Sequence, residues 1–225
     1  MGNAEVAEFS ISKARKAQTC LAKKIVTQDR LPKEIRLVAG VDAAYFGDRA
    51  FGAAAVLDYN SLEVLETQTV TQQVKFPYVP TLLSFRELPP IMACIRKLKH
   101  RPDVFLVDGH GKAHPYGCGL ASHLGVVLGK PTVGVAKSRL VGDPRQVSDE
   151  VFLVLDGEVV GALVETKKGS KPVYVSVGNM VSLETAVRIV KHCSLGNRIP
   201  EPIRVAHCAA GEERKAKIGA PTIKG

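Results

Sequence analysis

Three β-rich runs separated by tight turns restrict the fold of this chain more than any other feature. The runs cover Leu37–Tyr45, Phe51–Leu57 and Leu62–Val74, with turns at residues 47–48 and 58–61. Strands joined by connections this short pair in opposite directions. The sequence therefore predicts an antiparallel meander of three strands.

Helical and strand-like segments alternate after this meander. Apolar runs at Asp103–Val107 and Pro131–Ala136 predict two buried strands, and Leu120–Leu128 predicts an apolar helix between them. Parallel strands need a crossover connection of this kind. The alternation therefore predicts a mixed α/β fold with a central sheet.

Two prolines limit another predicted helix, which lies within Ser84–Lys99. Pro89 and Pro90 lack a backbone N–H and cannot lie deep inside a helix. The regular helix is therefore expected to start near Leu88, with Pro89 at its first position.

The rest of the chain adds shorter elements around this pattern. The further predictions are an amphipathic helix at 5–28, strands at Phe152–Leu155, Val159–Val164 and Val173–Val177, and a helix at Ser182–Cys193 with Ser182 as its N-cap. The tail from Lys215, about residues 215–225, is expected to be loose. With no internal repeat or linker, residues 1–225 are expected to form a single domain, a central mixed β-sheet flanked by helices.

Charge and cysteine usage restrict the partners and the compartment. The chain holds 31 Lys and Arg against 22 Asp and Glu, a net charge of +9, which favours a polyanionic partner or else reflects an ordinary solvated surface. Five irregularly spaced cysteines favour reduced thiols and a cytoplasmic location. No secretory signal or long apolar run is apparent, so we expect no membrane association.

Two carboxylates interrupt apolar strands. Asp42 lies within the apolar run Val38–Ala44. Asp108 ends the predicted strand Asp103–Val107 and is followed by Gly109. Burying a carboxylate is costly unless it is paired or bound to a metal. A buried ion pair for Asp42, and a turn or helix N-cap for Asp108, are the structural alternatives.

Glu87 is the third candidate carboxylate. It follows Ser84 in a Ser-x-x-Glu pattern, so a helix capping box is the alternative interpretation. Carboxylates that converge on one point repel each other unless a cation lies between them. Oxygen ligands suit Mg²⁺, and paired metal ions can assist hydrolysis of a phosphodiester.

The remaining candidates are ambiguous on spacing alone. Zinc bound by His110, His114 and Cys118 is conceivable, although the intervening glycines exclude a regular helix there. Lys137 ends a strand and suits a phosphate, or is a solvated lysine. Residues 77–80, Pro-Tyr-Val-Pro, form a stiff loop that suits an aromatic wedge between bases, or a packed surface loop.

These residues and their surroundings resemble the endonuclease V family, the deoxyinosine 3′ endonucleases. The resemblance extends from about residue 10 to about residue 210. The matching stretches, in order, are Val38–Asp42, PYVPTLLSFRE at 77–87, LVDGHGKAHP at 106–115, GLASHLGVVLGKPTVGVAKS at 119–138 and IPEPIRVAH at 199–207. The resemblance implies a ribonuclease H-like fold and Mg²⁺-dependent hydrolysis, with Mn²⁺ as a substitute. The implied cut is at the second phosphodiester bond 3′ to a deaminated purine and leaves 3′-OH and 5′-phosphate ends.

The resemblance also implies a role for individual residues. The implied metal-binding catalytic carboxylates are Asp42, Glu87 and Asp108, with Lys137 and His207 as accessory catalytic residues. The implied substrate-binding residues are Pro77, Tyr78, Val79, Pro80, Leu83, Arg86, Gly109, Gly111 and His114. Among these, Tyr78 and its neighbours resemble the wedge that fills the space left by a flipped base, which is easier to extrude when it pairs weakly.

The chain departs from the family pattern near the expected base pocket. Many members have an apolar residue where Lys112 stands and Arg where Tyr116 stands, and Val79 replaces a frequent Ile. The expected partner is damaged DNA, double or single stranded, and the enzyme is expected to be a monomer. The alternatives are an inosine-specific ribonuclease, a non-cleaving nucleic-acid binding relative, and another ribonuclease H-like nuclease.

Overall fold

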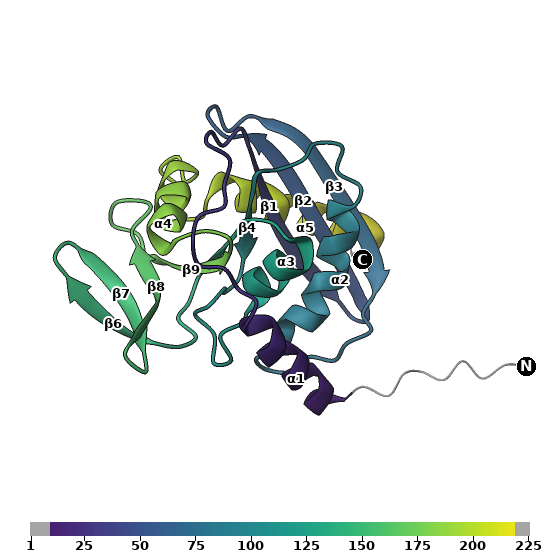
Figure 1. Ribbon diagram of the computed structural model, residues 1–225. Helices are drawn as coiled ribbons and strands as arrows, with labels where there is room; N and C mark the ends of the chain where they lie inside the picture. The colour runs from purple at the N-terminus through teal and green to yellow at the C-terminus, as the bar shows by residue number, and fades with distance from the viewer. Residues whose placement is uncertain (1–9, 219–225) are drawn as a thin grey trace, which may run out of the picture.

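The computed structural model describes residues 10–218 and confirms the mixed α/β prediction. Within this range one nine-stranded sheet is flanked by helices (Figure 1). Its strands are β1 (Leu37–Phe46), β2 (Arg49–Asp58), β3 (Val64–Gln73), β4 (Val104–Asp108), β5 (Thr132–Ala136), β6 (Asp143–Val147), β7 (Glu150–Leu155), β8 (Glu158–Val164) and β9 (Val173–Asn179). The spatial order is β3-β2-β1-β4-β5-β9-β8-β7-β6.

Strand direction divides the sheet into a parallel centre and antiparallel sides. β1, β2 and β3 form the predicted antiparallel meander. β1 runs parallel to β4, and β4 runs parallel to β5, so the carboxyl ends of these three strands lie at one edge. Ligands of open α/β sheets bind at such an edge.

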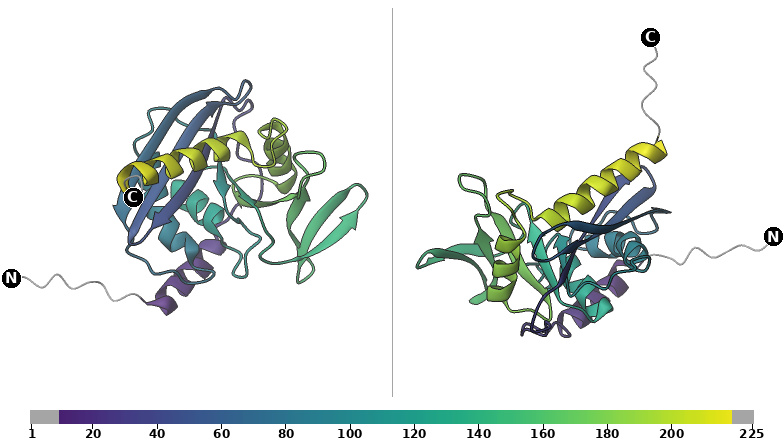
Figure 2. Two further views of the ribbon diagram at one scale, coloured as in Figure 1. Left: turned by 180° about the vertical axis from the view of Figure 1, so that it is seen from behind. Right: turned by 90° about the horizontal axis from the view of Figure 1, so that it is seen from above.

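Helices cover both faces of the sheet. α2 (Leu83–Ile95) and α3 (Leu120–Leu128) pack on one face, with α1 (Ile11–Ala22) against α3. α4 (Leu183–His192) and α5 (Glu201–Ile218) pack on the other, and Figure 2 shows α5 crossing the central strands from behind.

The pleat of the central strands separates these two layers. Val38 of β1 packs with the α5 side of the core, whereas Ala39 and Val41 pack with the α2 side. In β4, Leu106 belongs to the α5 side and Val107 to the α2 side. Neighbouring residues of a strand point to opposite faces, so Asp42 and Asp108 both fall on the α5 side.

Helix α2 corrects the prediction made from its prolines. It begins at Leu83, so Pro89 and Pro90 lie inside it. Pro90 packs directly against β2, where a Cβ on Gly52 would lie 2.6 Å from the Pro90 carbonyl oxygen. This tertiary packing compensates for the missing N–H groups. The capping-box interpretation is also wrong, because the N-cap is Leu82 and no side chain caps the helix.

The described chain after β5 contains two elements that the sequence did not predict. α5 continues to Ile218, so residues 215–218 are helical rather than loose, whereas residues 219–225 lie outside the described part. β6 is a polar, exposed edge strand that contains a proline. The N-terminal helix is confirmed only as Ile11–Ala22, and the predicted residues 5–9 also lie outside the described part.

One smaller prediction, the N-cap of α4, is confirmed. Ser182 caps α4, where its hydroxyl accepts a hydrogen bond from the Thr185 backbone N–H. All five cysteines are free thiols. Among residues 10–218, no helix combines the length and the apolar character that crossing a membrane requires.

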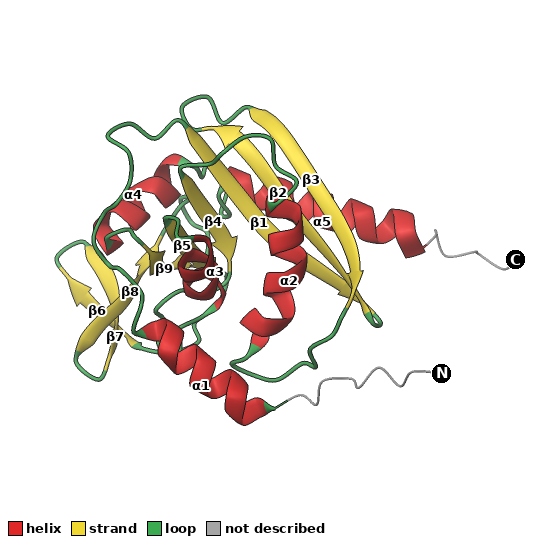
Figure 3. Ribbon diagram, turned by 45° about the vertical axis from the view of Figure 1, so that its right-hand side comes forward, coloured by secondary structure: helices red, strands yellow, loops and turns green. Residues whose placement is uncertain are grey.

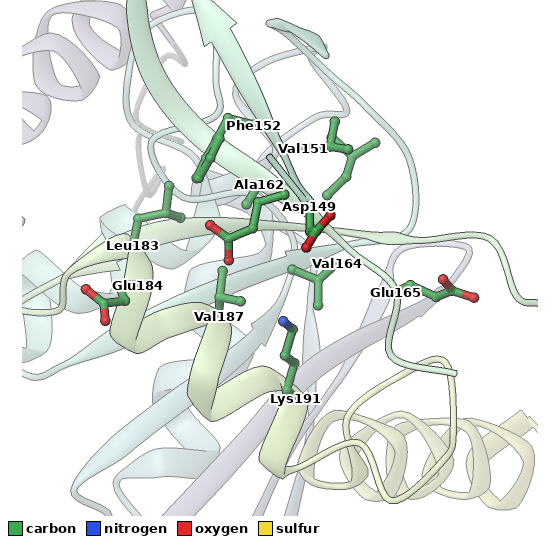
Figure 4. Close-up of a pocket in the computed structure, with 12 residues that line it drawn as sticks. Asp149, Val151, Phe152, Ala162, Val164, Glu165, Leu183, Glu184, Val187 and Lys191 are labelled. Carbon is green, nitrogen blue, oxygen red and sulfur yellow. The ribbon is translucent and has the colours of Figure 1, made fainter. Parts of the chain in front are cut away.

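A cleft lies between α4 and the strands β7 and β8, away from the edge that carries Asp42. Figure 4 shows the α4 side chains Leu183, Val187 and Lys191 opposite Phe152 of β7. Several carboxylates border this cleft: Asp149, Glu150, Glu165 and Glu184. An acidic border repels phosphate groups, so this cleft is a poor candidate for a nucleic-acid site.

A close backbone contact fixes α5 on β1. A side chain at Gly40 would collide with the backbone of Pro202, at the start of α5. Only glycine allows this approach. The contact sets the distance between β1 and the helix that carries His207.

Substituting Gly40 with alanine is expected to destabilise the protein by roughly 2–3 kcal/mol, because the added methyl group pushes α5 away from β1. The matched control is Gly211→Ala on α5, where nothing lies within 4 Å of the new Cβ. That control is expected to raise stability slightly, through better helix propensity. Chemical denaturation measures both changes, and equal stability of the two variants would contradict the role of this contact.

Candidate active site

Asp42 and Asp108 come together because their strands are adjacent and parallel. Val41 of β1 pairs with Val107 of β4, so the next residue on each strand is a carboxylate. Both strands are apolar up to this point and anchor the two side chains in the sheet. Each side chain is mostly buried, with 14% of Asp42 and 15% of Asp108 exposed.

A basic side chain from another element contacts each of these carboxylates. The Nδ1 of His207, on α5, donates to the Asp42 Oδ2 at 2.6 Å. The Nζ of Lys137, just after β5, donates to the Asp108 Oδ2 at 2.5 Å. Lys137 is therefore not an ordinary solvated lysine. Asp108 is not a helix N-cap either, because Gly119 caps α3.

Ligand atoms of Asp42, Asp108 and His207 all lie within 4.8 Å of one another. Two carboxylates this close repel each other, and burial together with the charge of Asp108 raises the pKa of Asp42. The hydrogen bond from His207 opposes that shift. Oxygen and imidazole donors at this spacing fit a divalent cation, which removes the repulsion.

Glu87 approaches the same place from α2, on the other side of the sheet. Burial is the main cause that raises the pKa of Glu87 to about 8, and the charges of Asp42 and Asp108 add to it. Glu87 lies in the same pocket as both aspartates but outside the compact group that includes His207. The sequence had grouped the three carboxylates Asp42, Glu87 and Asp108. In the structure the most compact group consists of the two aspartates and the imidazole of His207.

A pocket of about 520 Å³ opens beside the carboxylates. Many of the residues predicted to bind substrate line it: Tyr78, Pro80, Leu83, Gly109 and His114. Others do not line it: Pro77, Val79, Arg86 and Gly111. Tyr78 is 68% exposed at its mouth, so the loop that carries it does not bury its aromatic ring.

Arg86 and Gly111 have structural contacts instead. The Arg86 Nη1 donates to the Phe76 carbonyl at 3.1 Å, and its guanidinium lies over the Tyr45 ring. Arg86 thereby ties the start of the Tyr78 loop to α2 and β1. Gly111 sits against β9, where a side chain would collide with the Val177 carbonyl. Both residues support walls of the site.

Burial lowers the pKa of both histidines of the pocket, His110 and His114. Burial, with smaller effects from His110 and Arg15, lowers the pKa of His114 to about 4. Its Nδ1 accepts a hydrogen bond from the Tyr116 backbone N–H at 3.2 Å. The Nε2 of His110 donates to the Ser138 carbonyl. Over residues 10–218, His110, His114 and Cys118 do not form a metal-binding group, so the zinc interpretation has no support.

Sequence reasoning did not identify some residues of the site. Ser138 and Leu140, beyond the end of β5, also line the pocket. The signals in the sequence were their proximity to Lys137 and, for Ser138, its place at the end of the matching stretch 119–138. Tyr45 lies near Glu87, and burial together with the Glu87 charge raises its pKa. Nothing in the sequence around Tyr45 indicates this, because the contact depends on where α2 packs.

The fold and the site together define the class of protein. Acidic side chains at the ends of adjacent parallel strands, with a histidine from the helix on the same face, form a group that could hold a metal ion, as the sites of many nucleases do. The chain belongs to the endonuclease V family, whose model matches residues 19–208.

Individual relatives agree with this assignment. The chain is 48% identical to an endonuclease V from Thermofilum pendens over 204 residues, which cover 90% of this chain and 88% of the relative. The crystal structure of the Streptomyces avermitilis endonuclease V superimposes with a TM-score of 0.88 at 36% identity, covering 93% and 95% of the two chains. The Ciona intestinalis enzyme, at TM-score 0.83 and 31% identity over 93% and 99%, was solved with a 24mer DNA containing an inosine followed by a ribo-adenosine.

Proposed function

We propose that this protein is a DNA repair endonuclease that recognises deoxyinosine. In this proposal it hydrolyses the second phosphodiester bond 3′ to the lesion and leaves 3′-OH and 5′-phosphate ends. The observation that carries the proposal is the Asp42–Asp108–His207 group beside a pocket bordered by an exposed tyrosine. Family membership and the inosine-containing DNA in the Ciona intestinalis structure support it.

The proposed cofactor is Mg²⁺, with Mn²⁺ as a substitute. Asp42, Asp108 and Glu87 would hold the metal, and His207 borders them through its hydrogen bond to Asp42. A divalent cation bound here would supply Lewis-acid stabilisation of the charge on the reacting phosphate. The donor set supports this choice, because carboxylate oxygens dominate it and Mg²⁺ and Mn²⁺ prefer oxygen.

Lys137 and His207 act on the reacting phosphate in this proposal. The Lys137 ammonium is 43% exposed while it contacts Asp108, so it can turn from the carboxylate toward a phosphate oxygen. His207 is 63% exposed, and its Nδ1 is fixed by Asp42. Its Nε2 is thereby oriented outward, where it can hold or move a proton on the phosphate side.

The neighbouring pocket receives the flipped base in this proposal. Leu83 and Leu120 provide apolar walls, and the backbone around Gly109 provides polar groups. A neutral His114 suits an uncharged base, because it offers a hydrogen bond without an unpaired buried charge. Tyr78 stands at the mouth, where it can occupy the gap that the extruded base leaves in the stack.

The direct test compares cleavage of two end-labelled duplexes that differ only by deoxyinosine or deoxyadenosine at one position. With Mg²⁺ we expect one nick at the second bond 3′ to the inosine, and no comparable nick in the control duplex. Chelation with EDTA is expected to abolish the nick. Binding without cleavage in Mg²⁺ and in Mn²⁺ would instead identify a non-cleaving relative.

Inosine in RNA is the second candidate substrate. The observation that favours it is the ribo-adenosine after the inosine in the DNA bound to the Ciona intestinalis enzyme. Contacts to a 2′-OH distinguish RNA from DNA. A matched set of inosine-containing DNA, RNA and single-ribonucleotide strands decides between the two, and a preference for RNA would replace the DNA repair assignment.

A further inference from the structure

Helix α1 lies outside the acidic site, yet it contacts two loops that form the pocket. Figure 3 shows α1 below α2 and α3, and α1 packs against α3. Gln18 of α1 is only 1% exposed. Its Nε2 donates to the Thr81 carbonyl at 2.9 Å and to the Cys118 carbonyl at 2.8 Å. One buried amide therefore joins the loop of Tyr78 to the loop that follows His114.

Arg15, one turn earlier on α1, spans the same two loops. Its Nη1 donates to the Thr81 carbonyl and its Nη2 to the Pro80 carbonyl, both at 3.2 Å. The same guanidinium lies over the Tyr116 ring, 4.1 Å from its centroid. It also donates to Gln18 Oε1 at 2.9 Å, which orients the amide.

These contacts converge on a strained residue. Thr81 has a φ of +67°, a left-handed conformation that costs a β-branched residue free energy. Its carbonyl accepts hydrogen bonds from both Arg15 and Gln18, and its hydroxyl accepts another from Arg15. The surrounding donors therefore hold Thr81, three residues after Tyr78, in one conformation.

We propose that Arg15, Gln18 and Tyr116 are positioning residues that fix the Tyr78 loop relative to the base pocket. These three residues form what we call the α1 clamp. The inference rests on the proposed function, since it concerns how a base leaves a duplex. None of the hydrogen bonds of Arg15 or Gln18 reaches Asp42, Asp108 or His207.

The α1 clamp has a different importance for double-stranded and single-stranded substrates. In a duplex, the Tyr78 loop must remain at a set distance from the pocket while the bases around the lesion are separated. A rigid loop lowers the ordering cost of that step. In a single strand there is no pairing to disrupt, so the position of the loop matters less.

Two variants weaken the α1 clamp in different ways. Gln18→Glu keeps the shape of the side chain but replaces the donating amide nitrogen with a carboxylate oxygen that faces the carbonyls of Thr81 and Cys118. Its matched control is Gln28→Glu, the same change at an exposed position. Tyr116→Leu removes the aromatic face from an exposed side chain, and Tyr116→Phe retains that face.

The measurement is kcat/KM for duplex and single-stranded oligonucleotides with the same deoxyinosine, with melting temperatures of every variant. Gln18→Glu is expected to lower the duplex value about tenfold. Tyr116→Leu is expected to lower it about threefold. Both variants should leave kcat/KM for the single-stranded substrate near the wild-type value. The controls Tyr116→Phe and Gln28→Glu should leave kcat/KM near the wild-type value for both substrates.

Equal losses on both substrates, or no loss on either, would overturn the inference. Tyr116→Leu decides the question if Gln18→Glu does not fold, because Tyr116 is 44% exposed. If the wild-type protein cleaves neither oligonucleotide, the proposed function itself fails, and the inference fails with it. If the wild type cleaves both oligonucleotides and the variants cleave them equally well, only the inference fails.

Discussion

Substituting Asp42 with asparagine is expected to reduce deoxyinosine-dependent cleavage by about a thousandfold, while binding to the same duplex survives. Asparagine retains the size of the side chain but removes the negative charge between His207 and Asp108. The proposed cation then loses a ligand, and its affinity falls. Single-turnover cleavage and fluorescence anisotropy with the lesion duplex separate the two effects.

The matched control is Asp143→Asn, which makes the same chemical change on an exposed strand. The Asp143 side chain is 89% exposed and pairs with Arg139 on the surface. This variant is expected to cleave like the wild type, because surface pairs contribute little. Loss of cleavage in both variants, or in neither, would contradict a metal-binding role for Asp42.

The central sheet could be predicted because its signal is local. β1, β2 and β4 are largely apolar runs between turns, and these features lie within a few residues of one another. α5 was not predicted because its hydrophobic stripe is weak and polar residues dominate its C-terminal half. The start of α2 was wrong because packing of Pro90 on Gly52 outweighed the local preference of proline.

Some residues of the site could likewise be predicted from local sequence, and others could not. Asp42 and Asp108 stand out in the sequence because a carboxylate in an apolar strand needs a compensating partner. The partner of Asp42, His207, lies 165 residues away, and no spacing rule identifies it. The contacts of Gln18 with Thr81 and Cys118 likewise depend on how α1 packs. The resemblance suggested His207; no local pattern suggested Gln18.

The position of Glu87 implies a conflict between stability and activity. In the folded protein without a metal, burial and the nearby charges of Asp42 and Asp108 raise the pKa of Glu87 to about 8, above its ordinary value of 4.5. The unfolded chain ionises at the lower pH, so the folded state binds more protons between these two values. The free energy of unfolding therefore falls as pH rises through this window.

Glu87→Gln is expected to stabilise the metal-free protein while abolishing cleavage. Glutamine does not ionise, so the variant escapes this pH-dependent loss. The gain should be near zero below pH 4.5 and reach roughly 2–3 kcal/mol near neutral pH. Urea denaturation in EDTA at several pH values measures the gain, and the cleavage assay measures the loss, which we expect to be about a thousandfold.

Added Mg²⁺ is expected to reverse the order of stability. The cation compensates the charge of Glu87 in the wild type, so it stabilises the wild type more than the variant. Glu184→Gln, the same substitution at the border of the cleft in Figure 4, is the control. It should leave cleavage unchanged and lower stability by less than about 1 kcal/mol, the contribution of a carboxylate in the first turn of α4. A Glu87→Gln protein that is less stable than wild type in EDTA at neutral pH would show that Glu87 supports the fold instead of opposing it.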